Sequence, residues 1–346
     1  MKEQYGIDTD FDFIKSCLAS HDVVIKDKRI LITGGTGFLG SWLVAYLLWA
    51  NDVHGDNNHI SIVTRDKSRF LSNMPECRNN QLVTIIEHDL AVPLESDTSF
   101  DLIIHGATDV QKAVSDDDSF NCAAIGTQSI ISIAKLNPNC RVVYLSSGAV
   151  YGANAPDVWC KETDGPRDHA LASLNAYTAQ KISSEETLLV ASAGGQFRCS
   201  VARCFTFVGA FIPRTKQFAI SEFMQNALAD EDIILSGNEL TQRSYLYCAD
   251  FVVWLLVIFM RSENGAVINL GSNSAIAIGD LASKVVEVLG SKSRIVKATM
   301  SQNATATSYL PNTDKAGSQL GLRQYTTFED AIIKTRPWFD ISDENK

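Results

Sequence analysis

The sequence predicts an α/β fold, with a doubly wound parallel sheet followed by a smaller C-terminal domain. Two observations support this prediction. Short apolar runs alternate with helix-like segments from about residue 29, and the alternation becomes less regular after about residue 206. Strands that helices cover on both faces appear in a sequence as short continuous runs of Ile, Leu and Val, and this is the pattern seen here.

Residues 1–28 precede the first predicted strand and are expected to form an N-terminal extension. Four apolar residues in it would share one helix face, which could pack on the body of the protein or on a second subunit: Phe11, Ile14, Cys17 and Leu18. Residues 29–205 are then expected to form the first domain. Its strands are predicted at 30–33, 60–64, 83–87, 101–105, 141–146 and 199–205, and its helices at 38–50, 119–135 and 176–193.

A smaller, substrate-binding C-terminal domain is predicted over residues 206–346, with helices near 217–229, 250–261 and 279–289. The longest apolar run, residues 251–260, is too short to span a bilayer and is bounded by Asp250 and Arg261. We therefore expect it to be a buried helix.

Composition and charge exclude several classes of function. The chain of 346 residues is 45% hydrophobic and 20% charged, as is usual for soluble globular proteins. Its net charge of −10 disfavours nucleic acid and anionic membranes as partners. The eight cysteines include no C-x-x-C pair and the N-terminus carries no secretory signal, so we expect free thiols, no metal site and a cytoplasmic location.

A glycine-rich segment, residues 33–40, lies between the first predicted strand and the first predicted helix. Its spacing is G-x-x-G-x-x-G, and such a turn places backbone N–H groups and a helix N-terminus against a pyrophosphate. A tight turn without a ligand is the alternative. We expect residues 29–205 to be a dinucleotide-binding domain that contacts its cofactor through Gly34, Thr36, Gly37, Phe38, Leu39 and Gly40.

The end of the second predicted strand bears on the choice of cofactor. NAD sites place an acid there, on the ribose 2′-hydroxyl, whereas NADP sites place an arginine for the 2′-phosphate. Arg65 comes first and Asp66 second, so the sequence favours NADP, and NAD stays possible. After the third predicted strand, Asp89 and Leu90 are expected near the adenine, although Asp89 could instead cap the following turn.

Tyr177 and Lys181 are four residues apart, so on a helix they share one face. A cation beside a phenol favours the phenolate and moves the phenol's pKa toward neutral pH, which suits acid–base catalysis. This spacing alone is common on ordinary exposed helices. Ser147 supports the catalytic reading, because it ends a predicted buried strand and could hydrogen-bond a substrate oxygen while Tyr177 moves the proton. Its neighbour Ser146 is expected to be structural.

Taken in order, these motifs resemble those of the extended short-chain dehydrogenase/reductases of the nucleotide-sugar epimerase/dehydratase type, which have a Rossmann fold. The resemblance covers roughly residues 29–290 and rests on the glycine loop, Ser147 before Val150-Tyr151-Gly152, the Tyr177/Lys181 pair, and residues 203–209 and 243–250. It implies that Tyr177 is the acid–base residue, Lys181 its activator and Ser147 the substrate-orienting hydroxyl.

The resemblance also implies a substrate site and a partner. Arg243 would hold the diphosphate of a nucleotide-diphosphate sugar, a task that suits a guanidinium. Thr206 would contact the sugar or the phosphate, at a position where the family usually has Asn. Relatives commonly pair through two helices, so a homodimer through 119–135 and 176–193 is expected.

The two residues after Ser147 point to the reaction. Family members that dehydrate across C5–C6 resemble one another in carrying Asp-Glu there, decarboxylating members carry a Glu, and 3,5-epimerases carry a Cys. Gly148 and Ala149 can serve as neither acid nor base, which argues against all three reactions. Chemistry at C4 of the hexose remains: reduction of a 4-keto nucleotide sugar by NADPH, which Arg65 favours, or NAD-dependent 4-epimerisation.

Two other functions stay open at this point. Some proteins of this fold are non-catalytic NADP-binding sensors or scaffolds, but the presence of both Tyr177 and Lys181 favours an enzyme. A reductase of steroids or flavonoids is a further option, and Arg243 favours a diphosphate over such apolar substrates.

Overall fold

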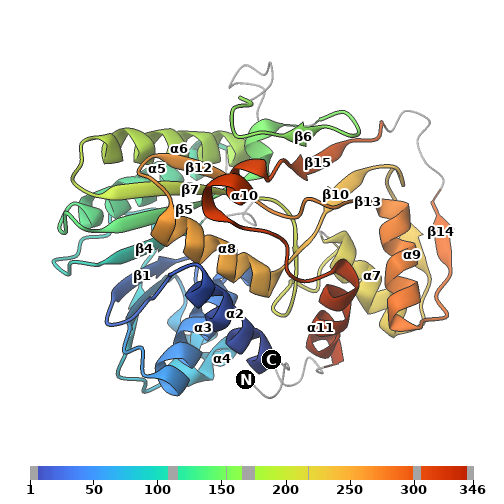
Figure 1. Ribbon diagram of the computed structural model, residues 1–346, viewed down its shortest axis with the longest axis horizontal. Helices are drawn as coiled ribbons and strands as arrows, with labels where there is room; N and C mark the ends of the chain where they lie inside the picture. Colours follow the sequence, from blue (N-terminus) through green and yellow to red (C-terminus); the bar gives the residue numbers. More distant parts are fainter. Residues whose placement is uncertain are drawn as a thin grey trace.

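The centre of the protein is a seven-stranded sheet in which every strand runs parallel to its neighbours, in the order β12-β7-β5-β4-β1-β2-β3 (Figure 1). The computed structural model describes residues 7–107, 116–152, 154–165, 176–216, 218–298 and 305–340. The predicted fold class is confirmed. The strands are β1 (Arg29–Thr33), β2 (His59–Thr64), β3 (Val83–Glu87), β4 (Leu102–His105), β5 (Arg141–Ser147), β7 (Arg198–Cys204) and β12 (Ala266–Leu270).

Six of these strands agree with the predicted ranges to within one residue at each end. The seventh, β12, was not predicted, because the polar Asn269 interrupts its apolar run and it follows the irregular part of the sequence. Strand order reverses between β1 and β4, so the C-terminal ends of these two strands flank a crevice. Open α/β sheets bind their ligands at such a point.

Helices cover both faces of the large sheet, as Figure 1 shows. On one face lie α5 (Asp116–Ala134) and α6 (Ala176–Ala193), and on the other lie α3 (Phe38–His54) and α8 (Cys248–Arg261). Successive side chains of a strand point to opposite faces of the sheet. In β1, Ile30 and Ile32 therefore belong to the core on the side of α3 and α8, and Leu31 belongs to the core on the side of α5 and α6. Helix α8 contains the long apolar run and is buried, as predicted.

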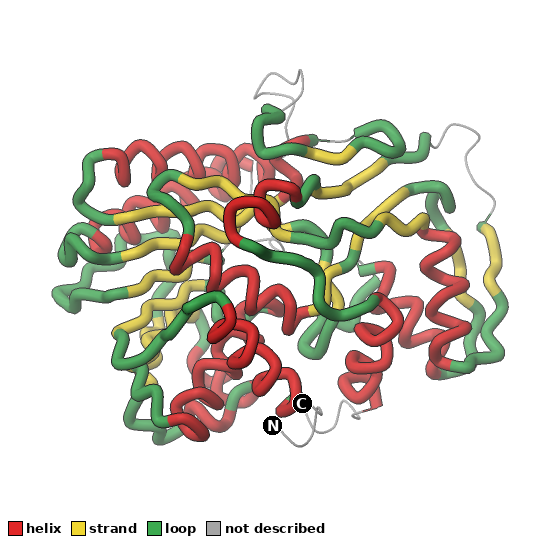
Figure 2. The backbone as a smooth tube through the Cα atoms, in the orientation of Figure 1, coloured by secondary structure: helices red, strands yellow, loops and turns green. Residues whose placement is uncertain are grey.

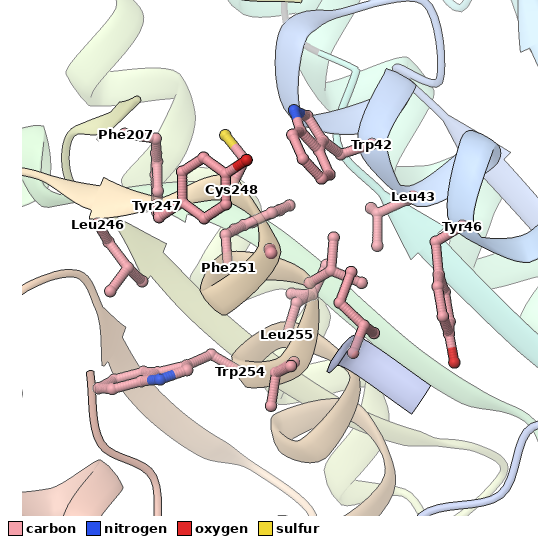
Figure 3. Packing of buried hydrophobic residues seen from close by; sticks show 14 of the residues in the cluster. Trp42, Leu43, Tyr46, Phe207, Leu246, Tyr247, Cys248, Phe251, Trp254 and Leu255 are labelled. Atoms are coloured by element: carbon pink, nitrogen blue, oxygen red, sulfur yellow. The ribbon is translucent and has the colours of Figure 1, made fainter. Parts of the chain in front are cut away.

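The larger core lies between the sheet, α3 and α8. Figure 3 shows Trp42 and Leu43 of α3 on one side and Phe251 of α8 on the other. The Trp42 ring lies 5.7 Å from the ring of Tyr247, measured between centroids, and meets it edge-on. Aromatic packing of this kind adds to the burial of apolar area, so α3 is held firmly where it enters the glycine loop.

The N-terminal helix α2 (Asp8–Ser20) packs on the body of the protein, against α3 and α8. Phe11 and Ile14 are fully buried, and the Phe11 ring lies 6.2 Å from that of Trp42. Asp10 accepts hydrogen bonds from the Tyr247 hydroxyl at 2.6 Å and from Lys334 Nζ at 2.7 Å. A second subunit is therefore not needed to cover the apolar face of this helix.

A smaller part of the protein lies beside the carboxyl ends of the large sheet, on the right of Figure 2. Its four-stranded sheet has the order β13-β10-β15-β6, and two strand pairs flank it. The strands are β6 (Trp159–Cys160), β8 (Phe207–Val208), β9 (Ile233–Leu235), β10 (Gln242–Ser244), β11 (Leu246–Tyr247), β13 (Ala275–Ala277), β14 (Ile295–Lys297) and β15 (Ser308–Pro311). The remaining helices are α4 (Lys67–Asn73), α7 (Ala219–Leu228), α9 (Ile278–Leu289), α10 (Asp314–Leu320) and α11 (Phe328–Asp340), and short 3-10 turns occur at η1 (Pro75–Cys77) and η2 (Gly148–Tyr151).

Strand β12 of the large sheet comes after five short strands of this smaller part. The predicted domain boundary at residue 205 stays a prediction.

Candidate active site

A cavity of about 850 Å³ opens at the carboxyl ends of β1, β4, β5 and β7, where the smaller part meets the large sheet. Its lining includes every residue that the sequence predicted for the site: Gly34, Thr36, Gly37, Phe38, Leu39, Gly40, Arg65, Asp89, Leu90, Ser147, Tyr177, Lys181, Thr206 and Arg243. These residues come from segments far apart in the chain, so the fold brings them together. Their individual roles stay predictions.

The backbone of the glycine loop packs tightly, with Gly40 against Gly34 and Gly34 against the turn after β4. A Cβ at Gly40 would lie 2.1 Å from the Gly34 carbonyl oxygen, and one at Gly34 would lie 2.6 Å from the carbonyl carbon of Gly106. Gly34 also has φ of 77°, which favours glycine. Helix α3 starts directly after this loop with no side-chain cap, so its first N–H groups are available to a phosphate.

Arg65 and Asp66, the two residues that bear on the choice between NADP and NAD, have different positions at the end of β2. Among the described residues, Arg65 lines the cavity and Asp66 does not. The Asp66 carboxylate instead caps helix α4, where it accepts a hydrogen bond from the Arg69 backbone N–H at 2.8 Å. Asp89 lines the cavity and also accepts from the Ala91 N–H at 3.0 Å, so it caps the turn after β3 as well.

His105, at the end of β4, is a buried residue of the cavity that the sequence analysis missed. The Thr33 hydroxyl accepts from the N–H groups of Gly106 and Ala107, both at 3.2 Å, and lies 2.8 Å from His105 Nδ1. With its acceptor positions used, this hydroxyl donates to Nδ1, so the proton of the ring is on Nε2. Burial and the charge of Lys181 lower the pKa of His105 to about 3, and the ring is neutral.

Tyr177 and Lys181 lie on one face of α6, as predicted, and Ser147 ends β5 beside them. Lys181 is buried, and its Nζ donates a hydrogen bond to the Leu145 carbonyl at 2.7 Å. The same Nζ lies 5.8 Å from the centre of the Tyr177 ring. Burial lowers the pKa of Lys181 to about 8. One turn further along α6, the buried Glu185 forms an ion pair at 2.8 Å with the partly buried Arg203 of β7, which fixes the helix on the sheet.

The pKa of Tyr177 lies above its ordinary value, in the direction opposite to the one predicted from its spacing with Lys181. Burial of the phenol is the largest cause, and a hydrogen bond with Ser147 acts the other way. Burial disfavours the charged phenolate more than its neighbours favour it. At neutral pH Tyr177 is therefore a phenol with a proton to donate.

The position after Ser147 is closed by an aromatic ring. A Cβ at Gly148 would lie 2.7 Å from Cε1 of Phe205, and the next two ring atoms would lie within 2.9 Å. Phe205 is buried and packs against the ring of Tyr309 at 4.7 Å between centroids. A larger residue at position 148 would have to displace this ring, so neither the residue type nor the space allows an acid there.

Residues of the smaller part of the protein line the other side of the cavity. Arg243 of β10 lines it, and its guanidinium lies 5.8 Å from the centre of the ring of Tyr309, its register partner on β15. Thr206 also lines it, but its hydroxyl donates to the Ser244 carbonyl. The Tyr309 hydroxyl lies 3.2 Å from Ser147 Oγ. Tyr309 was missed because it follows no recognisable motif.

Ser146 was expected to be structural. Its Oγ is buried without a hydrogen-bond partner in the part of the chain that the structure describes, and the residue lines the cavity. A buried hydroxyl is rarely left unpaired, so Ser146 Oγ is available to a ligand.

Two further findings concern metals and membranes. Among the described residues, no group of three or more His, Cys, Asp and Glu side chains is placed to hold a metal ion. In the same residues, none of the helices combines the length and the apolar character that crossing a bilayer requires.

A model of the NAD dependent epimerase/dehydratase family matches residues 30–271 of the chain. Over 322 residues the chain is 23% identical to a dTDP-glucose 4,6-dehydratase from Streptomyces niveus, covering 90% of this chain and 92% of that protein. Over 280 residues it is 26% identical to a UDP-N-acetyl-alpha-D-glucosaminuronate decarboxylase from Bacillus cytotoxicus, covering 78% of this chain and 83% of that protein.

Among solved structures, the protein is similar to a UDP-N-acetylglucosamine 4-epimerase from Methanobrevibacter ruminantium M1 in complex with UDP-N-acetylmuramic acid. The TM-score is 0.75 at 23% identity, over 91% of this chain and 99% of that one. At this identity the likeness establishes the fold.

Proposed function

The chain belongs to the NAD dependent epimerase/dehydratase family, and we propose that it reduces the 4-keto group of a nucleotide-diphosphate sugar with NADPH. The family match agrees with the resemblance carried by the motifs, and the chain is an NAD(P)-dependent enzyme of nucleotide-sugar metabolism. One observation carries the proposal: Ser147, Tyr177 and Lys181 line one cavity in which the neighbouring position, Gly148, is closed by Phe205.

The cavity fits a nicotinamide dinucleotide. The space that side chains at Gly34 and Gly40 would fill, together with the uncapped start of α3, suits a pyrophosphate. Such a cofactor supplies a hydride when bound. Arg65 and the residues from Asp89 to Leu90 would hold its adenosine half, and Lys181 would bind the ribose next to the nicotinamide.

NADPH is proposed over NADH because of how β2 ends. The acid that would contact a ribose 2′-hydroxyl, Asp66, is engaged in capping α4, whereas Arg65 lines the cavity. A guanidinium there can make charged hydrogen bonds to a 2′-phosphate.

Tyr177 would give its proton to the C4 oxygen of the substrate as C4 is reduced. Burial keeps this phenol protonated at neutral pH, which suits a reaction that begins with proton donation. Ser147 would donate a hydrogen bond to the same oxygen, and Lys181 would stabilise the phenolate that remains. Arg243 would hold the diphosphate and so place the hexose.

A dehydratase activity is disfavoured even though some relatives carry that name. Removing water across C5–C6 needs an added acid and base near the sugar, and Gly148 and Ala149 supply neither. The Phe205 ring also fills the space beside Gly148.

Nucleotide-sugar 4-epimerisation is the second candidate. It would use the same three residues, and several solved structures of similar fold are 4-epimerases. That reaction begins with proton removal by a Tyr177 phenolate, and burial raises the pKa of this phenol in the protein without a cofactor. A non-catalytic sensor or scaffold is the remaining alternative.

The test is a screen of UDP- and dTDP-sugars, including 4-keto forms, with and without NADPH. Consumption of NADPH that depends on a 4-keto nucleotide sugar supports the proposal. Conversion between 4-epimers without added cofactor would replace it by the epimerase, and cofactor binding without any turnover would favour the sensor. Tyr177→Phe is the control: it should abolish turnover and leave NADPH binding intact.

The cofactor proposal has its own test. Arg65→Ala should weaken NADPH binding by about tenfold and NADH binding much less, since only NADPH presents a 2′-phosphate. Titration calorimetry with both cofactors measures this. Equal losses for both would reject the contact with the 2′-phosphate.

We further propose a homodimer that forms through α5 and α6. These helices pack side by side, and a shallow hollow on their outer face is lined by Gln128, Ile131, Lys135, Glu186, Thr187, Val190 and Ala191. Val190 is 76% exposed there. A two-fold axis could pair Lys135 of each subunit with Glu186 of the other.

A cytoplasmic location is proposed because all eight cysteines are free thiols.

A further inference from the structure

The Ser147 hydroxyl lies between two tyrosines. On one side it forms a hydrogen bond with Tyr177, which opposes the effect of burial on that phenol. On the other side, Tyr309 OH lies 3.2 Å from Ser147 Oγ. The backbone N–H of Ala149 donates to the same oxygen at 3.1 Å. Three groups therefore meet at this one hydroxyl.

A serine hydroxyl has one proton and two acceptor positions. The Ala149 N–H fills one acceptor position. The alternative acceptor for the Tyr309 proton, the Cys204 carbonyl, is more distant at 3.4 Å. If Tyr309 donates to Ser147, both acceptor positions are filled, and the serine can only donate, toward Tyr177 or a substrate oxygen.

Tyr309 is also connected to the part of the cavity that binds the diphosphate in the proposed function. It stands on β15 in register with Arg243 on the parallel strand β10, and the guanidinium lies over its ring. Its ring packs against Phe205, so it cannot turn without moving the group that closes the position after Ser147.

We propose that Tyr309 is a positioning residue that commits the Ser147 hydroxyl to donate its proton, toward Tyr177 or toward the substrate oxygen. The inference rests on the proposed function and deepens it. Hydrogen bonds in a chain polarise one another, so donation by Tyr309 also makes Ser147 a stronger donor. Oriented donors of this kind stabilise developing charge without rearranging during the reaction.

Tyr309→Phe is the direct perturbation, because it removes the hydroxyl and keeps the ring. We expect kcat to fall about tenfold, with KM for the nucleotide sugar and the affinity for NADPH nearly unchanged. In a Ser147→Ala background the same substitution should have almost no further effect, because the residue acts through the serine. Equal losses in both backgrounds, or an unchanged kcat, would overturn the inference.

A second measurement needs no turnover, so it separates failure of this inference from failure of the proposed function. In the NADP⁺-bound protein, the pKa of Tyr177 can be followed by NMR of ring-labelled tyrosine, with Tyr177→Phe for assignment. Tyr309→Phe should raise this pKa, because the phenolate loses part of its hydrogen bond from Ser147. An unchanged pKa would reject the role of Tyr309 whatever the substrate.

Tyr151→Phe is the matched control. The Tyr151 ring packs against the same Phe205 ring, at 6.1 Å between centroids. Its hydroxyl donates to Asn269 Oδ1 at 2.6 Å. Loss of that hydroxyl should lower stability and leave the pKa of Tyr177 in place. A matching change in that pKa would show that disturbance of the packing alone explains the result, and would overturn the inference.

Discussion

Lys181 is a buried charge whose cost to stability can be measured. The residue is 3% exposed, and burial lowers the pKa of its side chain from 10.5 to about 8. Below pH 8 the lysine carries its charge in both the folded and the unfolded chain, so the folded protein bears the full penalty. Between pH 8 and 10.5 the unfolded chain binds the proton and the folded one does not, and the free energy of unfolding therefore rises with pH.

The magnitude follows from the two pKa values. The difference between 10.5 and about 8 corresponds to about 3 kcal/mol of destabilisation at pH 7. Lys181→Met removes the charge and keeps an unbranched chain of similar length. It also removes the hydrogen bond to the Leu145 carbonyl, at a cost of about 1 kcal/mol. The variant should therefore be about 2 kcal/mol more stable than the wild type at pH 7, and inactive.

Urea unfolding of the cofactor-free protein at pH 7 and at about pH 10 tests this expectation, because the stability gain should vanish near the upper pH. Lys26→Met, at an exposed lysine, is the control and should change stability little at either pH. A Lys181→Met variant that is no more stable than the wild type at pH 7, or a difference independent of pH, would refute the reasoning.

Three further substitutions test the loop, the closed position and the subunit contact. Gly40→Ala places a Cβ 2.1 Å from the Gly34 carbonyl oxygen, so cofactor affinity should fall more than about tenfold by calorimetry. Gly148→Ala should cost about 1–3 kcal/mol in urea unfolding, and much less when Phe205 is replaced by Leu. Val190→Glu should convert a dimer to a monomer in sedimentation experiments, because it buries a charge in the proposed contact.

The chain offers controls for the loop and the contact. Gly237→Ala adds a Cβ that meets nothing within 4 Å and should leave cofactor affinity unchanged. Val53→Glu changes a residue that is 57% exposed on α3 and should leave the oligomeric state unchanged. A wild type that sediments as a monomer would contradict the proposed dimer, and equal losses from Gly148→Ala with and without Phe205 would contradict the steric explanation.

The sequence predicted the large sheet well because its strands are buried on both faces. Continuous runs such as residues 30–32 mark both the position and the length of a strand. Strand β12 was not predicted because the buried polar residue Asn269 interrupts its apolar run. The side-chain amide of Asn269 donates hydrogen bonds to the carbonyls of Cys160 and Asn312. Periodicity carries no information about such a tertiary partner.

Site residues that belong to local sequence motifs could be predicted. Residues that reach the site through contacts with distant segments of the chain could not. Glycine spacing and a helical i, i+4 pair are visible in a sequence. His105 lines the cavity and Tyr309 contacts a residue that lines it. Their hydrogen-bond partners, Thr33 and Ser147, lie more than 70 positions away in the sequence. The direction of the Tyr177 pKa was wrong for the same reason, since burial is a property of the assembled cavity.

The late return of the chain to the large sheet at β12 has a consequence for how the protein can be divided. A fragment that ends at residue 205 would lack both β12 and α8, which cover β7 along one edge and one face. Strand β7 would then present unpaired backbone groups and apolar side chains, a surface that promotes aggregation. Splitting, shuffling or circularly permuting this chain at residue 205 should therefore yield insoluble halves, whereas a cut after residue 270 leaves all seven strands of the large sheet on one fragment.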